Sequence, residues 1–223
     1  MPIYYGTQKV KPSGIKNAYY GSTTVYSASR LPNTYQEVEY IESSGTQYID
    51  TGISAKSGLK IEATVSCLAS TIGYTQNAYI LYGGGIGWQN KYIQGEVDWS
   101  AYYAYNNSTQ QFQDTTIAAG SIVNVVHDDN KVYWNGILKA TFPASSWSSS
   151  YSIYIFAYNR SGSVGEYGIY RLKAFDIYDG NTLVRNFVPC YRIADNVIGL
   201  YDLVNNTFYT NSGSGTFTKG SDV

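Results

Sequence analysis

The 223-residue sequence predicts an all-β protein built as an antiparallel sandwich or barrel. Aromatic residues make up 16% of the chain and 25 of them are tyrosines, which favours sheets because aromatic rings pack well on a pleated surface. Good helix formers are scarce, and no segment predicts a helix of more than two turns. Turn signals recur about every 8 to 12 residues, a spacing typical of all-β domains.

Residues 1–30 predict a tyrosine-rich arm ahead of a domain that spans residues 31–223. A pattern of two tyrosines, a Gly-Thr or Gly-Ser pair and a later valine occurs twice, as expected for two miniature hairpins. The repeated tyrosines are Tyr4, Tyr5, Tyr19 and Tyr20. An isolated hairpin is marginally stable, so we expect an arm for attachment or oligomerisation. The alternative is a strand pair that covers a sheet edge of its own domain.

Strands with one buried face are expected along the rest of the chain. Apolar residues alternate with polar ones at Leu59, Ile61, Ala63 and Val65, which is the period of a β-strand. Asn135-Gly136 lies between two alternating segments and predicts a tight hairpin, because both residues accept a positive φ. The later expected strands cover residues 121–127, 131–134, 137–142, 151–158, 168–178, 182–188, 199–202, 207–209 and 215–219.

Composition excludes several classes of partner. Fifteen Lys and Arg residues balance 16 Asp and Glu residues for a net charge of -1, so neither nucleic acid nor a membrane is an expected partner. One His and two distant Cys residues are too few for a zinc cluster, so no metal and no cofactor are expected. The N-terminus lacks the pattern of a signal peptide, so we expect the protein to be made in the cytoplasm and to reach any outside location by another route.

Several segments resemble a known family. Residues 31–52 (LPNTYQEVEYIESSGTQYIDTG) are similar to the opening of laminin-G-like, concanavalin A-like domains that are common in phage and prophage proteins of gut bacteria. The segments IGLYD at 198–202, NNTFY at 205–209 and GSGTF at 213–217 resemble the end of those domains, and VYWNG at 132–136 resembles their central hairpin. The resemblance implies a two-sheet antiparallel jelly-roll sandwich on a virion, in a family whose members often bind glycans.

Enzymatic chemistry is not expected. Retaining glycosidases need two carboxyl groups about 5 to 5.5 Å apart. Glu96 and Asp98 match the first part of a glucanase strand motif, but Ser100 and Ala101 stand where the second catalytic Glu belongs. Pairing of Glu96 or Asp98 with Glu166 is the remaining route to a divergent polysaccharide hydrolase.

Three other sets of side chains have simple expectations. His127 is expected in a solvated hairpin turn, because no nucleophile motif accompanies it. Asp128, Asp129 and Asn130 lack the spacing of a calcium loop, with a Ca2+ site built from their oxygens as the alternative. Cys67 and Cys190 are expected to be free thiols, with a cross-sheet disulfide as the alternative.

Glycan binding is predicted from segments that combine aromatic rings, which stack on the C–H faces of sugars, with amides that bond to hydroxyls. Residues 82–90 are expected to form a glycine-rich loop, and residues 99–107 a loop that carries an aromatic ladder ending in amides. Residues 158–160 form a third motif. The candidate residues are Tyr82, Trp88, Gln89, Asn90, Trp99, Tyr102, Tyr103, Tyr105, Asn106, Tyr158, Asn159 and Arg160. The alternative is that these rings are core residues or merely cover the sheets.

Together these observations predict a phage virion protein, in the tail or capsid, whose arm contacts other virion proteins and whose sandwich binds a host-surface glycan. Homo-oligomers are compatible with this hypothesis, because many weak sites on one particle bind tightly together. The main alternative is a decoration or cement protein that binds no sugar and uses its aromatic residues for protein contacts.

Overall fold

The protein is all-β in its computed structural model, and no helix occurs in the part of the chain that is described. The structure describes residues 4–5, 8–9, 17–20, 23–27, 30–68, 80–86, 90–97 and 100–223. Side chains are described from residue 30 onward within these ranges, apart from those of Cys67, Asn90, Tyr92 and Ser100.

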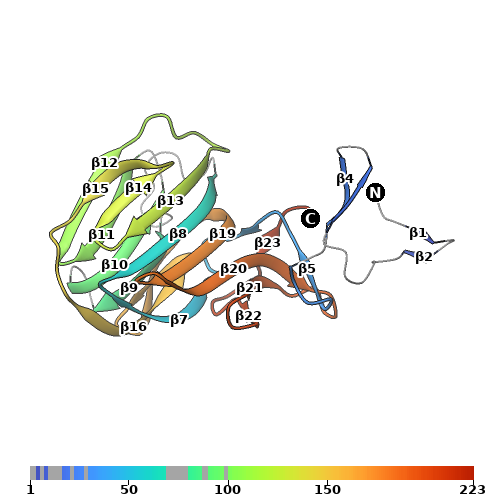
Figure 1. The fold of residues 1–223 in the computed structure, drawn as a ribbon. Helices are drawn as coiled ribbons and strands as arrows, with labels where there is room; N and C mark the ends of the chain where they lie inside the picture. Colours follow the sequence, from blue (N-terminus) through green and yellow to red (C-terminus); the bar gives the residue numbers. More distant parts are fainter. Residues whose placement is uncertain are drawn as a thin grey trace.

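Two consecutive hairpins form the N-terminal arm. The strands are β1 (Tyr4–Tyr5), β2 (Gln8–Lys9), β3 (Asn17–Tyr20) and β4 (Thr23–Ser27). β1 pairs antiparallel with β2, and β3 pairs antiparallel with β4, so each tyrosine pair of the repeat lies in the first strand of a hairpin, as predicted. Figure 1 draws both hairpins outside the two large sheets.

The smaller of the two large sheets has eight strands in the order β12-β11-β10-β9-β16-β7, with β17 and β18 beside β9. Its strands are β7 (Ile49–Lys56), β9 (Ile80–Ile86), β10 (Asn90–Glu96), β11 (Ser100–Asn106), β12 (Ser108–Gln113), β16 (Ser148–Ile155), β17 (Ala157–Arg160) and β18 (Ser163–Tyr167). Phe156, at a φ of 65°, separates β16 from β17, so the chain turns there and β17 runs parallel to β9.

The larger sheet has eleven strands, with the order β15-β14-β13-β8-β19-β20-β21-β22 and with β5, β6 and β23 off this path. Its strands are β5 (Tyr35–Glu37), β6 (Ile41–Glu42), β8 (Leu59–Cys67), β13 (Ile122–Asp128), β14 (Lys131–Trp134), β15 (Ile137–Thr141), β19 (Tyr170–Asp179), β20 (Thr182–Arg192), β21 (Ile198–Asp202), β22 (Thr207–Thr210) and β23 (Thr218–Lys219). The two sheets pack face to face as a β-sandwich (Figure 1).

The core between the sheets is filled by aromatic and β-branched side chains that alternate along the strands. Trp134 of the larger sheet donates its indole N–H to the Tyr103 hydroxyl of the smaller sheet at 2.9 Å, and the Phe112 ring packs edge-on against Trp134. Burial of such rings supplies most of the driving force for packing two sheets together.

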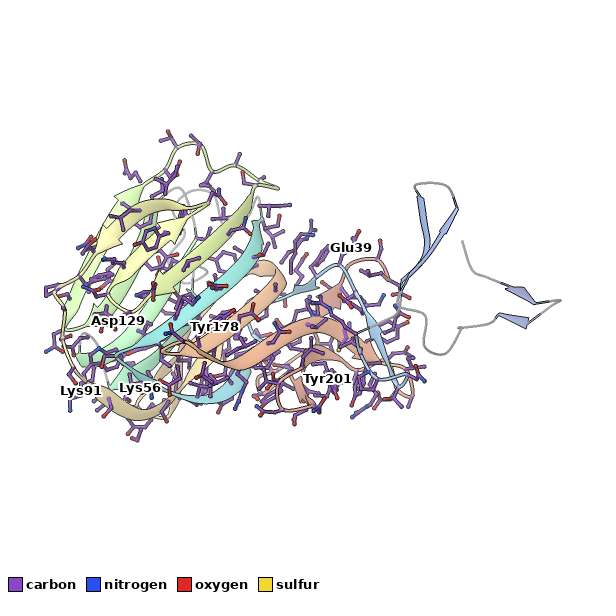
Figure 2. The ribbon with its side chains drawn as sticks, viewed as in Figure 1. Glu39, Lys56, Lys91, Asp129, Tyr178 and Tyr201 are labelled. Carbon is purple, nitrogen blue, oxygen red and sulfur yellow. The ribbon has the colours of Figure 1, made fainter. Side chains whose placement is uncertain are left out.

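Polar contacts join the sheets at their margins. Lys139 of β15 forms an ion pair with Asp114 at 2.8 Å, beside the end of β12. Tyr105 of β11 donates a hydrogen bond to Asp129, which also accepts the Gly58 N–H at 2.7 Å. Asp129, labelled in Figure 2, lies in the turn between β13 and β14. These links fix the two sheets in one relative position.

Most of the expected strands are present, and the tight hairpin is confirmed by the positive φ of Asn135 and Gly136, at 48° and 79°. The expectation of loops at 82–90 and 99–107 is wrong for the described parts, because residues up to Ile86 belong to β9 and residues 100–106 form β11. The expected strand over residues 215–219 is reduced to Thr218–Lys219.

Candidate functional site

Three of the predicted glycan-binding tyrosines are core residues. Tyr82, Tyr103 and Tyr105 are all at most 1% exposed, because their positions on β9 and β11 point between the sheets. Burial raises the pKa of Tyr82 well above its usual value and that of Tyr105 to about 12. In this structure these rings pack in the core, so they do not offer a stacking surface to a sugar.

His127 is buried, so its expected place in a solvated turn is wrong. It follows Val123 and Val125 in the inward-facing alternation of β13, and the turn begins only at Asp129. Its Nδ1 lies 2.8 Å from the Tyr82 hydroxyl, and its Nε2 has no hydrogen-bond partner among the described residues. Burial lowers the pKa of His127 to about 3, so the ring is neutral at pH 7.

Most of the other predicted residues either lack a described side chain or bond to other parts of the protein. Trp88, Gln89 and Trp99 lie outside the described residues, as does the side chain of Asn90. Asn106 and Asn159 have structural partners, since their side-chain amides donate to the Ser145 hydroxyl at 3.2 Å and to the Ser152 carbonyl at 3.0 Å. The tyrosines of the arm, Tyr4, Tyr5, Tyr19 and Tyr20, are described only by their backbone.

Tyr102, Tyr158 and Arg160 come together on the outer face of the eight-stranded sheet. The Tyr102 ring packs against the buried cluster that contains Tyr158. Arg160 and Tyr102 both act electrostatically on the Tyr158 hydroxyl, but burial is the larger effect and raises the pKa of Tyr158 to about 12. Residues on β11 and β17, more than fifty positions apart, therefore form one surface.

Strand register explains this convergence. Asp50, Tyr154, Gly83, Gln94 and Ala104 are directly paired across β7, β16, β9, β10 and β11, so all five point to the same outer face. Gly83, at the centre of this row, leaves room for the Tyr158 ring. A β-carbon on Gly83 would approach the Tyr158 ring to 2.8 Å.

A second group of tyrosines extends the same face toward β7 and β18. The ring centroid of Tyr48 lies 4.5 Å from that of Tyr154 and 6.3 Å from that of Tyr167. Tyr48 and Tyr167 are half-buried, whereas Tyr154 is largely covered. Burial is the main cause of the raised pKa of Tyr48 and of Tyr154, and the Asp50 carboxylate adds to both.

Polar side chains accompany these rings. Gln94, at 4% exposure, donates from its amide to Glu96 at 3.1 Å, and the other Glu96 oxygen accepts the Tyr102 N–H at 3.2 Å. Glu166 on β18 has a raised pKa because burial outweighs the opposing effect of Arg160. We use the name tyrosine face for this surface, formed by Tyr48, Tyr102, Tyr154, Tyr158 and Tyr167 with Asp50, Gln94, Glu96, Arg160 and Glu166.

The tyrosine face combines half-buried rings with amide, carboxylate and guanidinium groups, which is the chemistry that binds a polar ligand with apolar C–H faces. Sequence reasoning identified Tyr102, Tyr158 and Arg160 but missed Tyr48, Tyr154 and Tyr167 as binding candidates. The alternation of each strand was visible in the sequence, but the register that aligns five strands was not.

Thiol and metal-ligating side chains were the remaining candidates for a reactive site. Cys190 is a free thiol, as expected for this residue, and its burial raises its pKa to about 12. The side chain of Cys67 lies outside the described residues. No group of three or more His, Cys, Asp or Glu residues that would hold a metal occurs in the part of the chain that the structure describes. No described helix is long and apolar enough to cross a membrane.

Comparison of the sequence with protein-family models and with curated proteins finds no match for this chain.

Proposed function

We propose that the protein is a phage virion component whose β-sandwich binds a host-surface carbohydrate through the tyrosine face, without catalysis. The observation that carries this proposal is the convergence of five tyrosines and their polar neighbours on one side of the eight-stranded sheet. The family resemblance of residues 31–219 to laminin-G-like jelly-roll domains of phage proteins supports the same conclusion.

The chemistry of the tyrosine face favours a sugar over other ligands. Sugar rings present C–H groups that stack on aromatic rings and hydroxyl groups that bond to amides and carboxylates. Tyr48, Tyr102 and Tyr167 remain partly accessible for stacking, while the amide and acidic groups beside them supply hydrogen-bond partners. The net charge of -1 gives no general attraction for nucleic acid.

Binding without hydrolysis is favoured by the hydrogen bonds that Glu96 makes within the protein. Both of its oxygens are held as acceptors, one by the Gln94 amide and the other by the Tyr102 N–H. A carboxylate whose two oxygens both accept hydrogen bonds within the protein is less available to act on a substrate. Release of reducing ends from host polysaccharide by the purified chain would contradict this part of the proposal.

The two N-terminal hairpins serve as the attachment arm in this proposal. Two-stranded hairpins gain stability only when they lie on a larger surface, and other virion proteins provide such a surface. Tyrosine is enriched where proteins contact one another. The arm then holds many copies of the sandwich on one particle, and weak sugar binding by each copy adds up.

The direct test compares the full chain with a chain that begins at Leu31 in binding to host cells and to extracted cell-surface polysaccharide. We expect both chains to bind the polysaccharide with similar affinity, and only the full chain to be incorporated into virions. Failure of both chains to bind any host polysaccharide would contradict sugar binding, and incorporation of the shorter chain would contradict the role of the arm.

A decoration protein is the second candidate, because one corner of the larger sheet exposes apolar side chains. Ile122, Ile137 and Leu138 are 54%, 63% and 52% exposed. Ile122 begins β13 two residues before Asn124, which bonds to Asn135 in the turn that leads into β15. Clustered exposed aliphatic residues are typical of protein contacts. If Ile137→Ser with Leu138→Ser abolishes incorporation into virions while sugar binding is absent from the native chain, the decoration role replaces the lectin role.

A further inference from the structure

A groove whose lining includes no residue of the tyrosine face lies between two loops of the larger sheet. Its volume is about 500 Å³, within the range of pockets that hold small molecules. Polar walls come from Asn196, Thr210, Asn211 and Thr216, and the lining also includes Ile198 and Phe217, which pack against the core. The groove therefore has one apolar side and several polar ones.

The wall formed by residues 211–215 is rigid because Asn211 bonds in four directions. Its Oδ1 accepts the N–H groups of Tyr48 at 3.1 Å and Gly213 at 2.8 Å. Its amide donates to the carbonyls of Ser214 at 3.3 Å and Gly215 at 3.0 Å. A wall that is fixed before binding loses little conformational entropy when a ligand binds.

The opposite wall is held by an ion pair. The Arg192 guanidinium contacts the Asp195 carboxylate at 2.7 Å, and the Asn196 N–H donates to the Arg192 carbonyl at 2.8 Å. Asn196 has a positive φ of 59°, which projects its side chain from a tight turn. Because Arg192 compensates the charge of Asp195, and no other charged residue lines the groove, the lining is close to neutral.

Unused hydrogen-bonding groups face this neutral space. The side chains of Asn196, Thr210 and Thr216 are exposed and make no hydrogen bond with the described residues of the protein. An amide offers two donors and an acceptor, and each hydroxyl offers both roles. Such a set matches a ligand that carries several hydroxyl groups and no charge.

We propose that this groove binds an uncharged sugar of one or two rings, as a second site that is independent of the tyrosine face. The sugar hydroxyls bond to Asn196, Thr210 and Thr216, and one C–H face lies on the side formed by Ile198 and Phe217. An acidic sugar is disfavoured, because the lining includes no Lys or Arg to receive a carboxylate.

Amide chemical shifts of the full chain during titration with glucose, galactose, N-acetylglucosamine and their disaccharides test the proposal, with glucuronic acid as the charged comparison. At least one neutral sugar should shift the amides of residues 195–198 and 210–217, with a dissociation constant on the order of 1 mM. Asn196→Gly combined with Thr210→Val should weaken this binding at least about tenfold, because glycine keeps the positive φ and valine keeps the shape.

Thr207→Val is the matched control, since Thr207 lies on the same strand but outside the groove. It should leave the affinity unchanged. The proposal is overturned if no neutral sugar shifts these amides, if glucuronic acid binds equally well, or if the double variant binds normally. It is also overturned as an independent site if Tyr102→Ala with Tyr167→Ala abolishes the groove shifts, whereas loss of binding only at the tyrosine face contradicts the proposed function alone.

Discussion

Tyr105 shows how one hydroxyl joins the two sheets. It donates to the Asp129 carboxylate at 2.5 Å, and Asp129 in turn accepts the Gly58 N–H. A hydrogen bond to a charged group contributes about 1.5 to 3 kcal/mol, so Tyr105→Phe should lower the free energy of unfolding by that amount in urea at pH 7. Tyr133→Phe, whose hydroxyl makes no hydrogen bond with the described residues, is the control and should change it by less than about 0.5 kcal/mol.

His127 predicts a dependence of stability on pH. The folded protein holds it neutral, with a pKa of about 3, whereas the unfolded chain takes up a proton below about pH 6.5. The contribution of this neutral ring to the free energy of unfolding is complete above pH 6.5. It is lost as the pH falls toward 3, by about 1.4 kcal/mol for each pH unit. Between pH 7 and pH 5 the free energy of unfolding of the native chain should therefore fall by about 2 kcal/mol more than that of His127→Gln.

Urea unfolding of both chains at the two pH values measures this difference. His127 is the only histidine in the sequence, so the carboxyl groups titrate alike in both chains and cancel in the comparison. Equal losses in the two chains would show that the buried ring is not held neutral by its surroundings.

Residue-level reasoning from the sequence recognised the aromatic residues but not their side of the sheet. Tyr102 and Tyr103 are adjacent in one strand, yet Tyr103 bonds to Trp134 in the core while Tyr102 lies on the outer face. From the sequence alone, either tyrosine could belong to the buried set of this alternating strand. Only the partner sheet decides which of the two sets is buried.

Individual hairpins were the elements most accessible from the sequence. Asn135-Gly136 predicts a turn through local conformational preference alone, and the structure has both residues at positive φ. The break at Phe156 was not predictable in this way, because no glycine or proline marks it. Its positive φ of 65° is imposed by the packing of β17 against β9 and by its own burial beside Phe217.

The turn between β14 and β15 provides a test at this scale. Gly136 has a φ of 79°, where a side chain costs roughly 1 to 2 kcal/mol. Gly136→Ala should lower the free energy of unfolding by that amount, measured in urea. Asn135→Asp, which tolerates the left-handed region and keeps an oxygen acceptor for the Asn124 N–H, should have an effect below about 0.5 kcal/mol.

For the whole molecule, the all-β sandwich was predictable because composition, alternation and turn spacing all agree. The tyrosine face was predictable only in part, because it depends on strands that are distant in sequence. Asp50 and Tyr154 meet in the pairing of β7 with β16, and Gly83 and Gln94 meet in the pairing of β9 with β10. Long-range register of this kind is set by the whole core rather than by any local motif.

The most direct test of the central claim is the affinity of the full chain for oligosaccharides from host-surface polysaccharide, measured by calorimetry. Tyr102→Ala with Tyr167→Ala should weaken binding at least about tenfold, because each half-buried ring loses its stacking contact. Tyr133→Ala on the other sheet should bind like the native chain. Unchanged affinity in the double variant, with its fold intact by circular dichroism, would contradict the assignment of the tyrosine face as the carbohydrate site.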